Sequence, residues 1–108
     1  ALRILAVTSG QRSAAVPEIP TVREAGNLPD YEVIAWFALF VPAGTPADRV
    51  TRLNAAVTAA LATPELRTRL GTFGMDIRGS TPAEAVAFVR AETVKWTNAI
   101  RQAGIEPE

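Results

Sequence analysis

An uninterrupted apolar run in the first half of the chain constrains the fold more than any other feature. It covers residues 33–41, with the sequence VIAWFALFV. The run is rich in β-branched and aromatic residues. It lies between a Pro29–Asp30 turn and a segment containing Pro42 and Gly44, which is typical of a strand. Because no polar residue alternates with the apolar ones, the predicted strand over 31–41 needs cover on both faces, as strands in α/β proteins have.

The composition is that of one globular domain, and it excludes several kinds of chemistry. Hydrophobic residues make up 48% of the 108 residues, and eleven basic residues balance eleven acidic ones. Because the chain has no net charge that would attract nucleic acid, we expect no nucleic-acid partner. The absence of cysteine and histidine excludes a disulfide framework, a Cys/His zinc site and a Ser-His-Asp triad. We therefore expect no enzyme, no metal site and no cofactor.

Three Thr-Pro pairs begin the helices that we predict after the apolar run. Each pair places an N-cap hydroxyl before a proline at the first helical position. The pairs are Thr45-Pro46, Thr63-Pro64 and Thr81-Pro82, and Asp48 and Glu84 complete two capping boxes. Apolar residues at steps of three and four then predict helices over 46–62, 64–72 and 82–103, with Trp96 in the core.

Two shorter strands and a short helix complete the predicted order. Residues 2–8 alternate well enough for a strand, and residues 75–78 follow Gly74 as another. Between them, Thr21 begins a short helix that Gly26 is expected to close. Strands mixed with helices predict an α/β fold. The chain starts at Ala1 and its first strand has no obvious partner, so we expect either an excised piece of a longer protein or a dimer that exchanges this strand.

Few residues are candidates for a binding site. Thr8 and Ser9 follow the first predicted strand, where ligands of α/β sheets gather and where hydroxyls suit a carboxylate; an ordinary strand end explains them too. Trp36 lies in the apolar run, either in the core or as the wall of a pocket. The carboxylates fall mostly in caps, turns and helix surfaces, so we predict no catalytic residue. Arg12 and Arg23 are interpreted as solvated charges.

Three ordered segments resemble a known family over essentially the whole chain. They are LAVTS at 5–9 with Arg12, PEIPTVREAG at 17–26 and WFALFVPAGTP at 36–46. A helix containing Arg-Leu-Asn at 52–54 follows, and then a helix that begins with TPAE at 81–84 and carries Phe88, Glu92 and Trp96. This set resembles the C-terminal third of the substrate-binding proteins of tripartite tricarboxylate transporters, the Bug receptors. Departures from the family pattern, at Ile19 and Ala38, are small.

The resemblance implies a fold, a location and a function. The expected fold is the C-terminal part of a type II periplasmic binding protein, with residues 1–29 ending the second lobe and linking it to the first. Residues 30–108 would form the hinge strand and complete the first lobe. The expected function is a periplasmic receptor that captures small carboxylates or related solutes for membrane permease subunits, with Thr8, Ser9 and Trp36 as ligand-binding residues. The alternative is an interaction module without a ligand of its own, which forms a homodimer.

Overall fold

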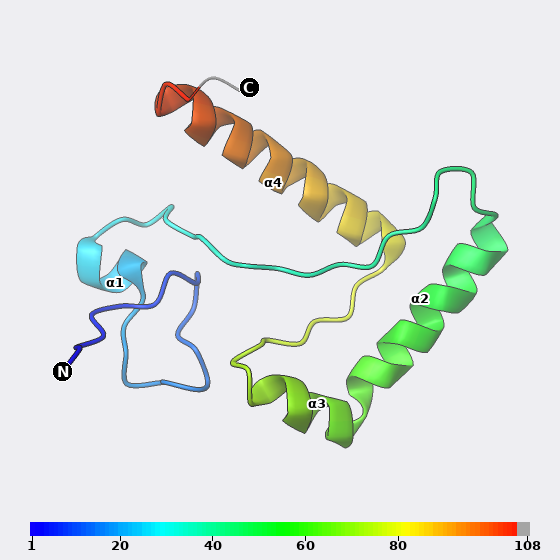
Figure 1. Ribbon diagram of the computed structural model, residues 1–108, viewed down its shortest axis with the longest axis horizontal. Helices are drawn as coiled ribbons and strands as arrows, with labels where there is room; N and C mark the ends of the chain where they lie inside the picture. The colour runs from blue at the N-terminus through cyan, green and yellow to red at the C-terminus, as the bar shows by residue number, and fades with distance from the viewer. Residues whose placement is uncertain (106–108) are drawn as a thin grey trace. The chain divides into compact units, whose positions relative to one another are not determined.

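The computed structural model describes residues 1–105, which contain four helices (Figure 1). The helices are α1 (Val22–Gly26), α2 (Ala47–Ala62), α3 (Pro64–Gly71) and α4 (Pro82–Gln102). The predicted bounds of the three longer helices agree with these to within one residue at each end. The Thr-Pro pairs therefore predicted the helix starts correctly.

The N-termini of two helices are held by threonine hydroxyls, as the sequence predicts. At α4, Thr81 Oγ1 accepts from the amide of Glu84 at 3.2 Å, and Glu84 Oε2 accepts from the amide of Thr81 at 2.8 Å. This is a complete capping box. At α1, Thr21 accepts from the amide of Glu24 and is itself only 1% exposed. Before α2, by contrast, the Thr45 hydroxyl donates to Pro42 O at 2.8 Å, which closes the preceding turn.

The end of α1 differs from its prediction. Gly26 was expected to close the helix, but it is the last helical residue, and Asn27 takes the left-handed conformation with φ 51°. Asparagine is one of the few residues besides glycine that adopts this conformation readily. Gly104, with φ 66°, follows α4 as predicted.

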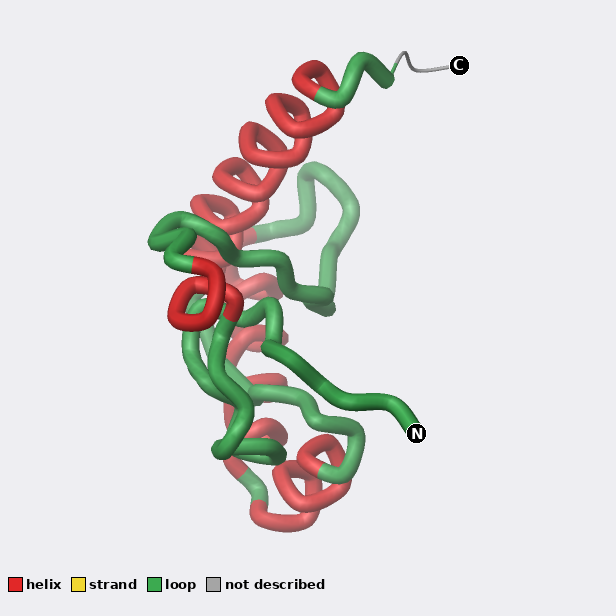
Figure 2. The backbone as a smooth tube through the Cα atoms, turned by 90° about the vertical axis from the view of Figure 1, so that its left-hand side faces the viewer, coloured by secondary structure: helices red, strands yellow, loops and turns green. Residues whose placement is uncertain are grey.

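The predicted α/β fold, including its type II periplasmic-binding-protein strands, is wrong for this structure. Within the described residues, the only strand-like pairing is an isolated parallel bridge between Val7 and Thr21. Figure 2 accordingly shows helices and loops alone over residues 1–105. The predicted strands at 2–8, 31–41 and 75–78 run as loop apart from that bridge. The physical reason is that a strand exists only through the hydrogen-bond ladder of a neighbour, and apolar spacing does not supply one.

The apolar run is not covered on both faces, which corrects a second expectation. Its segment at 31–42 is neither helix nor strand, and Phe37 and Leu39 are 84% and 81% exposed. No hydrophobic residue among residues 1–105 is buried. The predicted core residue Trp96 is also exposed, and its indole Nε1 donates to Glu92 Oε2 on the same helix at 3.0 Å. The apolar pattern therefore predicts burial of these side chains, and in this structure they are not buried.

The chain divides into two compact units. The first consists of Ala1–Leu39 and Thr63–Ile77, and the second of Phe40–Ala62 and Arg78–Glu108, of which the structure describes residues up to 105. In the second unit α2 contacts α4, and Asn54 Nδ2 on α2 donates to Ser80 O just before α4 at 2.7 Å. The candidate site residues Thr8, Ser9 and Trp36 all lie in the first unit. The assignment of residues 1–29 and 30–108 to different lobes stays a prediction.

The capping box of α4 gives a testable prediction. We expect Thr81→Ala to lower the free energy of unfolding of α4 by about 1 kcal/mol at neutral pH, because the amide of Glu84 loses its acceptor. The measurement is thermal unfolding followed by far-ultraviolet circular dichroism. Thr93→Ala is the control, since its hydroxyl bonds only Val89 O within the same helix and its loss should cost little.

The cost of Thr81→Ala should also depend on pH. The backbone amide of Thr81, and then its hydroxyl, hold the pKa of Glu84 below its ordinary value of 4.5. A carboxyl group whose pKa is lowered on folding stabilises the folded state at pH values above its ordinary pKa. This stabilisation is lost as the pH falls through the pKa of the folded state. The difference between the variant and the unaltered chain should therefore shrink below pH 4.5. A difference equal to that of Thr93→Ala would contradict the capping box. A difference independent of pH would contradict the hydrogen bond from the Thr81 hydroxyl to the Glu84 carboxylate, which is the part of the pKa shift that the variant removes.

Candidate functional site

The loop at residues 8–10 is anchored at its start, where Val7 and Thr8 form three backbone hydrogen bonds to two other segments. Val7 donates to Pro20 O, and Val22 donates to Val7 O, both at 2.9 Å. One residue later, Val33 donates to Thr8 O, also at 2.9 Å. The chain at 7–8 is thereby fixed between the link that leads into α1 and the start of the apolar run. This loop is the best-defined candidate site in the first unit.

Thr8 and Ser9 offer different hydrogen-bonding capacity within this loop. The Ser9 hydroxyl donates to Gln11 O at 2.7 Å, so its proton is used within the loop and its oxygen remains available only as an acceptor. The Thr8 side chain is exposed, and its hydroxyl forms no hydrogen bond among the described residues. A carboxylate only accepts hydrogen bonds, so Thr8 is the better suited of the two to receive one.

An ion pair that the sequence did not single out lies directly beside this loop. Arg23 Nη2 is 2.8 Å from Glu32 Oε2, and Arg23 Nε donates to Tyr31 O at 2.7 Å. Both charged side chains are partly buried. A Cβ atom added at Gly10 would lie 2.8 Å from Glu32 Oε2 and 3.2 Å from Arg23 Nη2, so the loop packs against the pair. The prediction that Arg23 is a solvated charge is wrong, because its guanidinium is partly buried and paired with Glu32. Nothing in the sequence indicated the pair, since a separation of nine residues matches no helix or strand period.

A second ion pair in the same unit lies nearer the surface. Arg12 Nη2 is 2.6 Å from Glu24 Oε2, and Arg12 Nη1 donates to Pro17 O at 3.3 Å. The hydrogen bond from Arg12 lowers the pKa of Glu24, and the same bond raises the pKa of Arg12. The pair ties the link at 12–17 to α1. Both side chains are about half exposed, so solvent screens their attraction.

Trp36 lies three residues after Val33, on the segment that the loop binds. It is partly buried, unlike Phe37 and Leu39 that follow it. The structure therefore places all three predicted ligand-binding residues on segments joined by the Val33 to Thr8 hydrogen bond. Their contact with a ligand stays a prediction.

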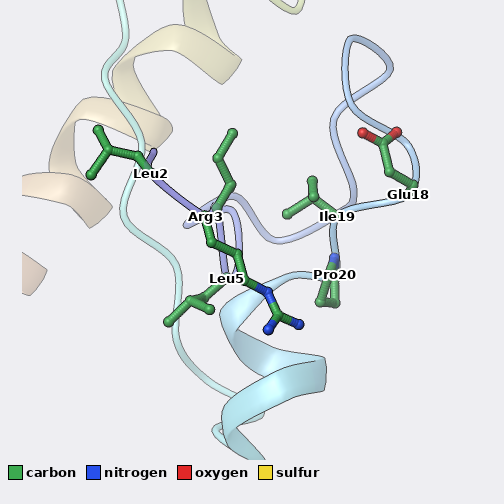
Figure 3. A pocket seen from close by; sticks show the side chains of 7 residues that line it. Leu2, Arg3, Leu5, Glu18, Ile19 and Pro20 are labelled. Carbon is green, nitrogen blue, oxygen red and sulfur yellow. The ribbon is translucent and has the colours of Figure 1, made fainter.

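A separate hollow of about 560 Å³ lies along the N-terminal segment (Figure 3). It is lined by Leu2, Arg3, Ile4, Leu5, Glu18, Ile19 and Pro20, and by none of the predicted site residues. Its apolar side chains are largely exposed, and Figure 3 shows the Arg3 guanidinium and the Glu18 carboxylate well apart. Because its polar groups do not converge on one point, we assign it no function.

The described part of the chain offers no metal site. Among residues 1–105, no group of three or more acidic, histidine or cysteine side chains is placed to hold an ion. No helix in the same range combines the length and the apolarity needed to cross a membrane.

Comparison with known proteins gives one family. Residues 1–105 match the family described as the tripartite tricarboxylate transporter family receptor. The chain is 38% identical over 99 residues to a UPF0065 protein from the tcbD-tcbE intergenic region of Pseudomonas sp. (strain P51), which is 92% of the chain and 30% of that protein. It is 39% identical over 103 residues to a UPF0065 protein from the clcB-clcD intergenic region of Pseudomonas knackmussii, which is 95% of the chain and 57% of that protein.

A third relative carries the Bug name. The chain is 30% identical over 103 residues to Protein BugT of Bordetella pertussis, which is 95% of the chain and 31% of BugT. The chain thus spans between about a third and somewhat over half of the length of these relatives. The family that matches is described as one of transporter receptors. Since the match runs over residues 1–105, the chain belongs to the tripartite tricarboxylate transporter receptor family, and the resemblance in its sequence is confirmed.

Proposed function

We propose that this chain serves in an extracytoplasmic, periplasmic solute receptor of a tripartite tricarboxylate-type transporter. In this role it captures small carboxylates or related solutes and passes them to the permease subunits in the membrane. The observation that carries the proposal is the family match over residues 1–105, which includes every residue of the loop at 8–10. The proposal concerns the whole receptor. The chain spans only about a third of the length of the relatives from Pseudomonas sp. and Bordetella pertussis.

The chemistry of the loop is suited to binding without reaction. The exposed Thr8 hydroxyl can donate to a carboxylate. The backbone hydrogen bonds of Val7 and Thr8 hold the backbone of this residue in place. Trp36 supplies an aromatic surface for the apolar part of a solute. A hydrogen bond to a charged group contributes more than one between neutral groups. We therefore propose that Thr8 binds the carboxylate and that Trp36 lies against the apolar part of the solute. The predicted ligand residue Ser9, whose proton is used within the loop, would line the site without donating to the carboxylate. We assign no residue to a covalent step.

Titration with carboxylates tests this proposal. Heteronuclear NMR detects weak binding, and the probes are citrate, tricarballylate, succinate and glutamate. We expect at least one of them to shift the amide resonances of residues 8–10 and the indole resonance of Trp36. Thr8→Val should weaken that binding by about tenfold or more, because a hydrogen bond to a charged group is lost and the side-chain shape is kept. Thr51→Val is the control, since it makes the same change at a threonine whose hydroxyl donates to Ala47 O within α2.

Two results would contradict the receptor function. One is the absence of a shift at residues 8–10 with every probe while the chain hydrolyses or transfers one of them. The other is equal loss of binding in Thr8→Val and Thr51→Val, which would place the ligand away from the loop.

A second candidate function, a self-associating interaction module, follows from the exposed apolar run. Phe37, Leu39 and Phe40 are mostly exposed, and an apolar surface of this kind marks an interaction site in a stable protein. We propose a second copy of the chain as the partner, because the extended backbone beside these residues can pair with its own equivalent.

Sedimentation equilibrium tests the second function. We expect the chain to be a dimer at micromolar concentration, and the double variant Phe37→Ser with Leu39→Ser to be a monomer. Leu2→Ser with Leu5→Ser is the control, since it removes two exposed leucines outside the run. A folded monomer of the unaltered chain at micromolar concentration would exclude the module.

A further inference from the structure

We propose that Arg23 and Glu32 form a positioning clamp that fixes the loop at residues 8–10 in the geometry needed for a ligand. The inference rests on the proposed function, because the loop that these two residues support is the proposed ligand-binding loop. Neither residue contacts the ligand in this proposal. They act through the backbone of the loop and are positioning residues.

The first argument comes from the register of the backbone hydrogen bonds. Arg23 directly follows Val22, whose amide donates to Val7 O, and Glu32 directly precedes Val33, whose amide donates to Thr8 O. The two segments that hold the loop therefore carry the two partners of the ion pair next to their points of attachment. At 2.8 Å, the pair joins these segments to each other. If the loop moves away from either segment, the Arg23–Glu32 contact between the two segments is disturbed as well.

The second argument comes from the shape of the arginine. Arg23 uses Nε for the Tyr31 carbonyl at 2.7 Å and Nη2 for the Glu32 carboxylate at 2.8 Å. A guanidinium presents these donors in a rigid fork, so two adjacent residues of the second segment are gripped in one orientation. A lysine has a single ammonium at the end of a flexible stem and cannot reproduce both contacts in this geometry.

The third argument is the close approach of Gly10. Its own φ does not fall in the left-handed range, so conformational freedom does not explain a glycine here. The close packing explains it, since an added Cβ would lie 2.8 Å from Glu32 Oε2 and 3.2 Å from Arg23 Nη2. The loop therefore rests directly on the clamp.

The experiment measures amide hydrogen exchange of Val33, whose amide donates to Thr8 O, in variants of the full 108-residue chain. We expect Arg23→Gln and Glu32→Gln each to speed exchange of the Val33 amide by about tenfold, and the double variant to add little, because coupled residues are not additive. Arg23→Lys should restore only part of the protection. Arg12→Gln is the matched control, because it removes an arginine–glutamate pair of the same unit that joins the link at 12–17 to α1.

A second variant tests the packing of the loop without removing a charge. Gly10→Ala should loosen the loop as Glu32→Gln does, because the methyl group displaces the carboxylate. Gly71→Ala is its control, since a Cβ added there meets nothing within 4 Å. Circular dichroism verifies that the helices of each variant persist, so a loss of loop protection is not a loss of folding.

The same variants separate the clamp from the receptor function. With citrate as the probe, we expect Arg23→Gln to weaken binding by about tenfold through loss of the aligned loop, and Arg12→Gln to leave it unchanged. If citrate does not bind the unaltered chain, the exchange of Val33 still decides on the clamp. The inference is overturned if exchange of Val33 is the same in Arg23→Gln and the unaltered chain, or if Arg12→Gln changes it equally.

Discussion

Three backbone hydrogen bonds, between residues 7–8 and the segments at 20–22 and 33, are the constraint on which the candidate site depends. They bring three stretches of chain together in a unit where no hydrophobic side chain is buried. With little apolar burial available, polar contacts must fix the geometry. Thr21, only 1% exposed, lies at the centre of this arrangement, because it caps α1 and pairs with Val7. The charged contacts of Arg23 then join the second and third stretches.

The apolar run at 33–41 imposes the opposite demand. Its first residues are partly buried beside the loop, whereas Phe37, Leu39 and Phe40 are exposed to solvent. Burying such side chains stabilises a protein by about 1.5–3 kcal/mol each, so a surface of this kind favours association. The site and the exposed run thus lie on one continuous segment.

The sequence predicted the features that depend on neighbours along the chain and failed on those that depend on distant ones. Thr-Pro pairs and three-four spacing located α2, α3 and α4, because the proline preference at a helix start and helix hydrogen bonds are local. The hydroxyl of Thr81 caps α4 as predicted, whereas that of Thr45 closes the turn before α2 and Thr63 forms no side-chain cap. The strands were wrong, since apolar content does not provide a partner strand. Trp96 fitted the apolar stripe of its helix, yet it is exposed and bonded to Glu92. Thr8 and Ser9 were predicted from their position after a strand and from the family resemblance, and their role stays a prediction, whereas the Arg23–Glu32 pair required the fold.

Amide hydrogen exchange of the unaltered chain tests the central claim that backbone hydrogen bonds organise the loop. Exchange is slow only where an amide is hydrogen-bonded in a persistent structure. The account predicts that the amides of Val7, Val22 and Val33 exchange more slowly than that of Leu39 in the exposed run. Exchange of Val33 as fast as that of Leu39 would contradict it, because the loop would then have no lasting attachment to the segment that carries Glu32 and Trp36.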